Sequence, residues 1–396
     1  MSGFNLIVRA VLTYLQLSRA KKIAQRKNFF LELGLDLRVL SRLFCIRAPL
    51  FATIGITHRC PLSCWHCSLV GRCEQELSLE QLKNLARQLD QIGTCGFGLT
   101  GGEPFLRKDL VEIISSFPRL APVFIYSSGA GLKEETAREL ARFKNLAVVL
   151  SLDHSQPEVH NQLRGNERAW DWVFTAKEIL QAQKIPVHFS TVVTRERLLS
   201  GEFEEFCYLI KEKWGVNYLQ VFLPRPVGKL TAYPDQLLSS SDLNRFKEIL
   251  ERVLASPRGP FIAGYPVIES RELLGCCGGF VRIYISPQGD FYPCDFNPVC
   301  FGNVLEEPMS ELWSRARSYF RYPRGECFIQ RNWKNLSSDS GSGKIDFIQL
   351  EGKEDLLALE PALIYQDFGL LTYRFLAPHL YLATVGWLVL RKQGKV

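Results

Sequence analysis

The sequence predicts an α/β protein whose core is a partial (β/α)6 barrel, and the alternation of two kinds of segment supports this fold class. Six short apolar segments, rich in β-branched residues, alternate with amphipathic helical segments over residues 48–230. Strands that alternate with helices form parallel sheets with the helices outside. Six units fall short of the eight that close a barrel, so we expect an open one. A small cysteine-rich extension follows, and amphipathic helical segments are expected at both ends of the chain.

The expected strands are short runs dominated by aliphatic and aromatic residues. In chain order they are 50–57, 95–100, 122–127, 146–152, 186–194 and 217–223. Helices are expected between them, at 79–89, 134–142, 170–183 and 202–213. Ser78, with Gln81 three residues later, predicts a capping box at the start of the first helix. In such a fold, functional groups gather at the carboxyl ends of the strands.

The segments outside the barrel differ from it in composition. Residues 240–255 predict a connecting helix, 282–293 predict two strands joined by a Pro-Gln-Gly-Asp turn, and the Ser/Gly run 337–343 predicts a linker. The chain is therefore expected to divide into a basic amphipathic helical segment (1–47), the barrel core (48–230), a connecting helix and linker (231–263), the cysteine-rich extension (264–335), and a linker with an apolar C-terminal helical segment (336–396).

The net charge and the two ends bear on partners and location. The formal net charge is +7, from 48 basic and 41 acidic residues, which allows contact with anionic lipid or acidic substrates and does not indicate nucleic acid. Residues 5–45 and 375–390 resemble segments that lie on a membrane surface, although the latter is shorter than the roughly 20 residues of a bilayer span. The alternative is that both ends pack on the protein. Without a secretory signal we expect a cytoplasmic protein, either free or peripheral on the membrane.

Directly after the first expected strand, the run RCPLSCWHCS places Cys60, Cys64 and Cys67 in one loop. In a reducing compartment, clustered cysteines indicate metal ligands or catalytic thiols rather than disulfides. Three thiolates can hold three irons of a cubane cluster and leave the fourth iron open to a small molecule. Zinc is the alternative, and it would need a fourth ligand such as His58 or His66. The spacing favours the cluster.

A second motif, GGEP, follows the second expected strand at residues 101–104. Two glycines allow a backbone to approach a ligand closely, although a pair of glycines is also common in ordinary turns. The position of the motif makes it more specific. Neighbouring strand ends meet at one edge of a parallel sheet, so GGEP should lie beside the open iron.

The cysteine spacing, GGEP and the six-unit pattern together resemble the radical S-adenosylmethionine (SAM) superfamily over residues 48–230. The resemblance implies three ligands of a [4Fe-4S] cluster: Cys60, Cys64 and Cys67. It also implies a segment that holds the amino group of SAM: Gly101, Gly102, Glu103 and Pro104. The implied chemistry is reductive cleavage of SAM to methionine and a 5′-deoxyadenosyl radical, which abstracts hydrogen from the substrate. An electron donor such as flavodoxin or ferredoxin is the implied partner.

Further positions resemble the family less completely. Ser151 and Asp153 end the fourth strand, where similar enzymes place a polar SAM contact, and Arg164 lies in a segment similar to H-x3-RG, whose arginine reaches the SAM carboxylate. The residue before the last loop cysteine is usually an aromatic residue that contacts adenine, but here it is His66. In the third loop, 127–129 read SSG where many relatives have an Asn before Gly.

The cysteine-rich extension resembles the SPASM or the shorter twitch extension, which carries auxiliary iron–sulfur clusters. Cys276 and Cys294 fall in a C-x12-G-x4-C pattern, but Gln330 stands where a second cysteine should follow Cys327. One auxiliary cluster is therefore expected, with zinc or no metal as alternatives. The expected ligands are Cys276, Cys294, Cys327 and Cys300, with Cys277 as the alternative fourth.

The sequence therefore predicts a radical SAM enzyme acting on an unidentified substrate. A peptide or protein substrate is the first expectation, because relatives with this extension commonly modify peptides. A membrane lipid or isoprenoid is an alternative suggested by the terminal segments. A non-catalytic metal-binding scaffold is the alternative from another class.

Overall fold

The computed structural model describes residues 48–69, 75–264, 269, 275–336 and 344–347. The predicted terminal segments and the 337–343 linker lie outside these residues. Within the described ranges, none of the helices has the length and apolar character needed to cross a bilayer.

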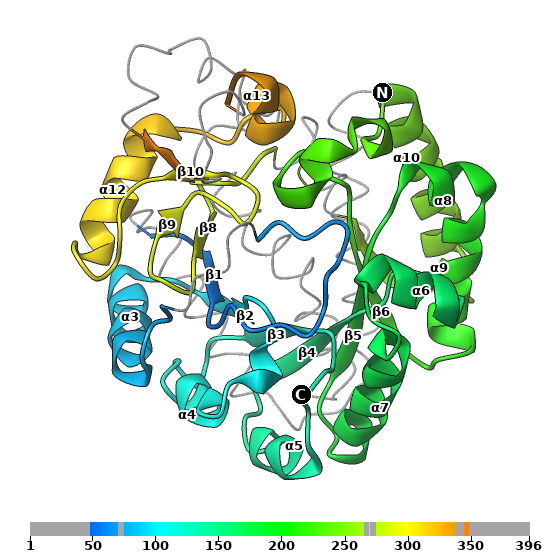
Figure 1. The fold of residues 1–396 in the computed structure, drawn as a ribbon, viewed down its shortest axis with the longest axis horizontal. Helices are drawn as coiled ribbons and strands as arrows, with labels where there is room; N and C mark the ends of the chain where they lie inside the picture. Colours follow the sequence, from blue (N-terminus) through cyan, green and yellow to red (C-terminus); the bar gives the residue numbers. More distant parts are fainter. Residues whose placement is uncertain (1–47, 70–74, 265–268, 270–274, 337–343, 348–396) are drawn as a thin grey trace.

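One curved sheet forms the centre of the molecule, and it contains all six predicted strands. They lie side by side in chain order, all parallel (Figure 1). Their bounds are β1 (Phe51–Gly55), β2 (Gly96–Thr100), β3 (Val123–Ser127), β4 (Leu146–Ser151), β5 (Val187–Val192) and β6 (Tyr218–Phe222). Within the described part of the chain, the sheet ends at an edge on each side, so the predicted open barrel is confirmed.

The sheet is wider than the six predicted strands. On one side β7 (Phe261–Gly264) pairs in parallel with β6. On the other side β8 (Arg282–Ile285) pairs in parallel with β1 and antiparallel with β9 (Phe291–Tyr292). The predicted strand–turn–strand is therefore confirmed, and it joins the edge of the barrel. A separate two-stranded sheet pairs β10 (Val299–Cys300) with β11 (Ile345–Asp346).

Five helices match predicted segments: α3 (Leu79–Ile92), α5 (Glu134–Leu140), α7 (Ala169–Ala182), α9 (Glu202–Glu212) and α10 (Ser240–Ala255). The capping box of α3 is confirmed, because Ser78 and Gln81 exchange hydrogen bonds of 2.8 and 3.2 Å. Other helices were not predicted: η2 (Pro104–Leu106), α4 (Leu110–Ser115), α6 (Pro157–Arg164), α8 (Arg195–Ser200), η3 (Gly228–Ala232), η4 (Pro234–Gln236), α12 (Met309–Tyr319) and α13 (Phe328–Leu336).

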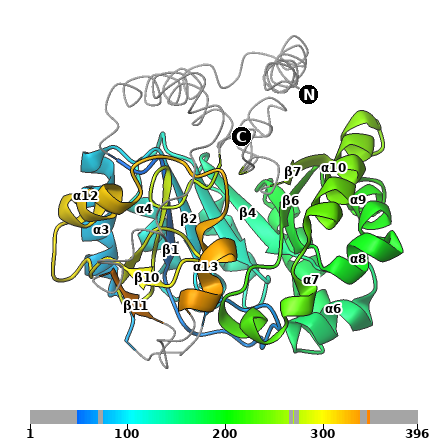
Figure 2. The same ribbon diagram turned by 90° about the horizontal axis from the view of Figure 1, so that it is seen from above.

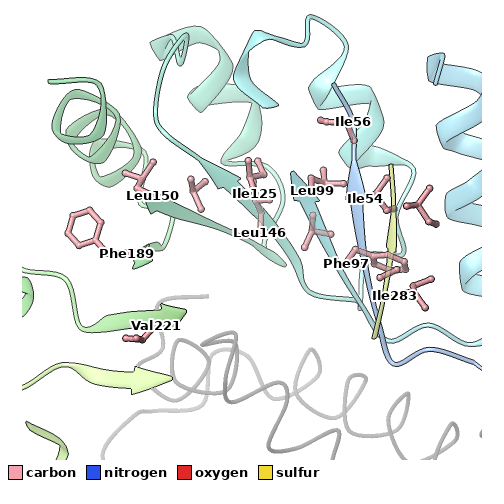
Figure 3. Close-up of a cluster of buried hydrophobic side chains, with 14 of the residues drawn as sticks. Ile54, Ile56, Phe97, Leu99, Ile125, Leu146, Leu150, Phe189, Val221 and Ile283 are labelled. Carbon is pink, nitrogen blue, oxygen red and sulfur yellow. The ribbon is translucent and has the colours of Figure 1, made fainter. Parts of the chain in front are cut away.

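The main core lies between the convex face of the sheet and the helices that cover it. Alternate strand residues such as Ile54, Leu99, Ile125 and Leu150 point towards these helices and are fully buried (Figure 3). Among the helices of the extension, α12 lies beside α3 (Figure 2), and the Met309 N–H donates to Gln88 Oε1 at 2.9 Å. The opposite residues of each strand face the barrel interior, where they line a cavity.

Candidate active site

A cavity of about 770 Å³ opens at the carboxyl ends of the strands, and the predicted loop lies on its wall. Cys60, Cys64 and Cys67 all line this cavity, and all three are free thiols that are partly exposed. Three thiols from one loop, facing a space large enough for a small molecule, form the donor set that a cluster with one open iron requires.

The cysteine loop is held by backbone contacts with two later segments. The Ser63 N–H donates to Arg164 O at 3.1 Å, and the Lys229 N–H donates to Cys67 O at 3.1 Å. A side chain at Gly228 would bring its Cβ to 2.2 Å from Cys67 O, so this close approach requires glycine. In the part of the chain that the structure describes, no three Cys, His, Asp or Glu side chains converge as they would on a single ion. A four-iron cluster distributes its ligands over separate metal atoms and does not need such convergence.

The GGEP segment packs against the cysteine loop through its backbone. The Gly102 N–H donates to Thr57 O at 2.6 Å, and the Glu103 N–H donates to Arg59 O at 2.7 Å. A Cβ at Gly102 would lie 2.2 Å from Arg59 O, so this glycine is needed for loop-to-loop packing. Gly101 and Gly102 line the cavity, whereas Glu103 and Pro104 lie behind its wall.

The Glu103 carboxylate organises the end of the neighbouring strand β3. It accepts hydrogen bonds from Ser127 Oγ at 2.6 Å, from the Ser128 N–H at 2.7 Å and from the Phe105 N–H at 3.1 Å. Burial raises the pKa of Glu103, although these hydrogen bonds oppose the shift. The serines of the SSG sequence, which departs from the family pattern, therefore serve as partners for this carboxylate.

Three of the other predicted SAM contacts, Asp153, Arg164 and His66, lie close together on the cavity wall. Arg164 Nη2 lies 2.7 Å from Asp153 Oδ2, and Arg164 Nη1 lies 3.8 Å from Cys64 Sγ. His66 Nε2 lies 3.9 Å from the same Asp153 oxygen. Burial alone would raise the pKa of Asp153, but the adjacent Arg164 guanidinium holds it well below its usual range, so the carboxylate is ionised. Ser151 lines the same stretch of wall.

His66 occupies the position at which relatives usually carry an aromatic residue. Its ring lines the cavity and meets the Trp65 ring edge-on, with centroids 5.7 Å apart. Burial lowers the pKa of His66 to about 4, so the imidazole is neutral at pH 7. A neutral, flat ring can stack on a base.

In the extension, two predicted ligands are in contact and a third lies near them. Cys276 and Cys327 share a hydrogen bond between their thiols, and Cys294 lies close enough to influence both. The hydrogen bond from Cys276 and the N–H groups at the start of α13 hold the pKa of Cys327 below its usual range. Burial raises the pKa of Cys294 to about 12.

The two residues proposed for the fourth position do not join this group. The Cys300 thiol lies 3.3 Å from Gly302 O and beside Lys344. Cys277 is fully buried, and its thiol donates to Gly275 O at 3.3 Å. Instead, the acidic group near the thiols of Cys276 and Cys327 is the carboxyl of Glu269.

Two polar residues on the cavity wall, Tyr284 and Asp295, were not predicted. Asp295 follows Cys294, and burial raises its pKa. Tyr284 on β8 is buried, and its hydroxyl has no hydrogen-bond partner among the described residues. Arg225 lies three residues after the end of β6, within the segment 224–228, whose resemblance to strand ends of the family predicts a place on the wall of the adenosine pocket. These residues face the cavity from the side of the extension.

An open α/β barrel with a three-thiol loop at the carboxyl ends of its strands is typical of a class of iron–sulfur enzymes. Comparisons with known proteins assign this chain to the same class. The model of the radical SAM superfamily matches residues 54–206, and the model of an iron–sulfur cluster-binding domain, SPASM, matches 276–335. The chain therefore contains a radical SAM domain and a SPASM-type extension. It is an enzyme whose cofactors are a [4Fe-4S] cluster and SAM, with further iron–sulfur binding in the extension.

Two curated relatives span most of the chain. The chain is 27% identical over 344 residues to the PqqA peptide cyclase of Streptomyces rochei. This alignment covers 80% of this chain and 90% of the relative. It is 26% identical over 317 residues to the AdoMet-dependent heme synthase of Methanosarcina barkeri, covering 71% and 88%. Both names are those of enzymes, which argues against a non-catalytic scaffold.

Solved structures share the fold. The crystal structure of Streptococcus suis SuiB bound to the precursor peptide SuiA aligns with a TM-score of 0.58 at 18% identity, covering 77% of this chain and 76% of that one. The structure of anSMEcpe with bound AdoMet aligns with a TM-score of 0.55 at 20% identity, covering 85% and 99%.

Proposed function

We propose that the enzyme modifies a peptide by removing a hydrogen atom from it within the 770 Å³ cavity. When bound, the cluster and SAM supply the 5′-deoxyadenosyl radical for this step. The observation that carries the proposal is the layout of the cavity, which has the cysteine loop on one side and polar groups near the extension on the other. The naming of a similar protein as a peptide cyclase favours a peptide as the substrate class.

Cys60, Cys64 and Cys67 would bind the cluster, and the wall around them would bind SAM. Gly101 and Gly102 offer backbone groups to the amino end of SAM, while Arg164, held by Asp153, offers its guanidinium to the carboxylate. His66 would stack on adenine, and Ser151 would donate to a polar group of SAM. The role of Glu103 and Pro104 would be to fix the loop, because they lie behind the wall.

A second cavity of about 330 Å³ supplies the additional room that a peptide needs. It adjoins the first, since Val227, Tyr284 and Phe296 line both. Trp333 and Ile329 of α13 also line it. Sites for ligands of the size of SAM occupy roughly 300–1,000 Å³, so SAM and a side chain fit the first cavity while flanking peptide residues occupy the second.

In the extension, Cys276, Cys294 and Cys327 would hold one auxiliary cluster. A cluster with three thiolates leaves one iron for a further ligand. A reducing protein such as flavodoxin or ferredoxin would supply the electron. Contact with a membrane surface, proposed from the terminal segments, falls outside the described residues.

The proposal is tested by incubating the anaerobically reconstituted enzyme with SAM, dithionite and short peptides encoded beside its gene. We expect one such peptide to change mass, by the loss of two hydrogen atoms or by a new cross-link, and to raise 5′-deoxyadenosine formation above the peptide-free rate. The Cys64→Ala variant is the control and should leave the peptide unchanged. Peptides that all stay intact, while a lipid extract stimulates 5′-deoxyadenosine formation, would contradict the peptide proposal.

A further inference from the structure

We propose that Arg225 binds a carboxylate of the substrate and that Gln330 holds its guanidinium in position. The inference rests on the proposed function, since it concerns the peptide that would enter the same cavity. The substrate would be a peptide with a negative charge near the reacting residue, from an acidic side chain or a free C-terminus.

Arg225 lies where the barrel meets the extension. It follows β6, is half-buried, and lines the 770 Å³ cavity. Its Nη1 donates a hydrogen bond to the Gln330 side-chain oxygen on α13. Gln330 stands where a second cysteine would have followed Cys327, and its amide is therefore available to hold an arginine rather than to bind metal.

Among the described residues, Arg225 differs from the two other arginines of the cavity wall, Arg164 and Arg282, because no carboxylate pairs with it. Arg164 lies 2.7 Å from Asp153, Arg282 lies 3.2 Å from Glu269, and Lys229 donates to Ser63 Oγ at 2.9 Å. The partner of Arg225 is a neutral amide. Across the described ranges, no ion pair within 4.0 Å neutralises its charge.

The guanidinium is suited to grip a carboxylate. It has five N–H donors in a planar fork, and the bond to Gln330 Oε1 uses only one of its nitrogens. Bidentate pairing with a carboxylate is both strong and orienting. A half-buried cation attracts such a group more strongly than an exposed one, because water screens it less.

The position of Arg225 favours substrate over SAM. The predicted arginine for the SAM carboxylate, Arg164, lies 3.8 Å from Cys64 Sγ. Arg225 instead lies near Cys327 and Glu269, on the side of the extension, where its charge stabilises their negative forms. The two arginines therefore face different parts of the cavity.

The test measures which peptides the reconstituted holoenzyme binds in the presence of SAM. A displayed library of random 12-residue peptides is panned anaerobically, once with free C-termini and once with amidated C-termini. The variants are Arg225→Gln, Arg225→Lys and Gln330→Glu, which neutralises Arg225 without removing it. Arg321→Gln is the matched control, because Arg321 is an exposed arginine of the extension that bonds to Ser318 O. SAM affinity and peptide-free 5′-deoxyadenosine formation are measured for every variant.

We expect wild type and Arg321→Gln to show one of two enrichments. Enrichment of peptides that contain Asp or Glu would identify a side-chain carboxylate, and enrichment only in the library with free C-termini would identify the terminal carboxylate. Arg225→Gln and Gln330→Glu should reduce this enrichment about tenfold or more, and Arg225→Lys should reduce it less. SAM affinity and peptide-free cleavage should change less than about twofold. An acidic preference that survives in Arg225→Gln would overturn the proposal. So would a loss of SAM affinity in that variant, which would assign Arg225 to the cofactor. If wild type forms no 5′-deoxyadenosine, it is the proposed function that fails.

Discussion

At Cys64, two influences on the thiol act in opposite directions. Burial raises its pKa, whereas the Arg164 guanidinium at 3.8 Å lowers it. Iron binds the thiolate, so an adjacent cation helps this cysteine to lose its proton when the cluster assembles. Arg164 would thereby connect cluster binding to the proposed SAM site, and the Asp153 carboxylate at 2.7 Å would keep it oriented.

The auxiliary site gives a residue-scale prediction. Cys294→Ala should lower the iron content from about eight to about four atoms per chain, because Cys294 lies with Cys276 and Cys327. SAM cleavage without substrate should stay measurable, while peptide modification should be lost. Iron analysis and 5′-deoxyadenosine chromatography check both.

Cys300→Ala is the matched control, since the Cys300 thiol contacts Gly302 and Lys344 instead. It should retain all the iron. An equal loss of iron in both variants would show that Cys300 is a ligand after all.

The sequence predicted the loop cysteines because their spacing is a contiguous motif. It did not predict Tyr284 or Asp295 as cavity residues, since each is a single polar residue whose neighbours come from distant segments. It also grouped Cys300 with Cys276, because nearness along the chain does not report the direction of a side chain on β10. Such features depend on tertiary packing.

At the scale of elements, the loop after β2 is joined to the end of β3 by one buried carboxylate. Glu103→Ala should lower the free energy of unfolding by at least about 2 kcal/mol, because it leaves the donors of Ser127 and Ser128 without an acceptor. Urea denaturation of the apoprotein measures this. Glu139→Ala on the exposed face of α5 is the control and should change the free energy by less than about 0.5 kcal/mol. Equal effects of the two changes would contradict the assigned role.

A buried histidine on β5 should make stability depend on pH. His188 is fully buried between the rings of Phe124 and Tyr218, and burial lowers its pKa to about 3. The unfolded chain binds this proton near pH 6.5, so the stabilisation is complete above that pH and decreases as pH falls towards 3.

His188→Phe should remove this dependence. Between pH 7.5 and 5, wild type should lose about 2 kcal/mol more unfolding free energy than the variant, as urea denaturation at both pH values would show. Identical losses in the two proteins would mean that His188 takes up a proton in the folded state.

The strands and long helices were predictable because each is encoded by a local pattern. The Ser78 capping box and the apolar run of β1 each specify one element without reference to the rest of the chain. The pairing of β8 with β1 was not predictable, because the register between Phe51 and Arg282 joins segments more than 200 residues apart. The short helices α6 and α8 were not predicted, because neither is long enough to show a sustained helical period of apolar residues.

At the scale of the whole molecule, the barrel and the extension share one sheet and enclose the cavity between them. Strand β8 continues the sheet next to β1, and the following segment contributes Asp295 and Phe296 to the cavity wall. On the proposed assignments, the SAM cluster would lie on the cavity wall and the auxiliary cluster would be bound within the extension. Because the extension contributes part of the wall, it would help to exclude water from the radical and to determine which substrates enter.

The central claim is that the loop after β1 holds a cluster that cleaves SAM. Its most direct test is anaerobic reconstitution with iron and sulfide, followed by dithionite and SAM. Wild type should form methionine and 5′-deoxyadenosine in equal amounts, and Cys64→Ala should form neither, because two thiolates cannot hold a cubane with one open iron. Cys95→Ala, a buried cysteine away from the cavity, should behave as wild type. Cleavage by Cys64→Ala at the wild-type rate, or its absence from wild type, would contradict the account.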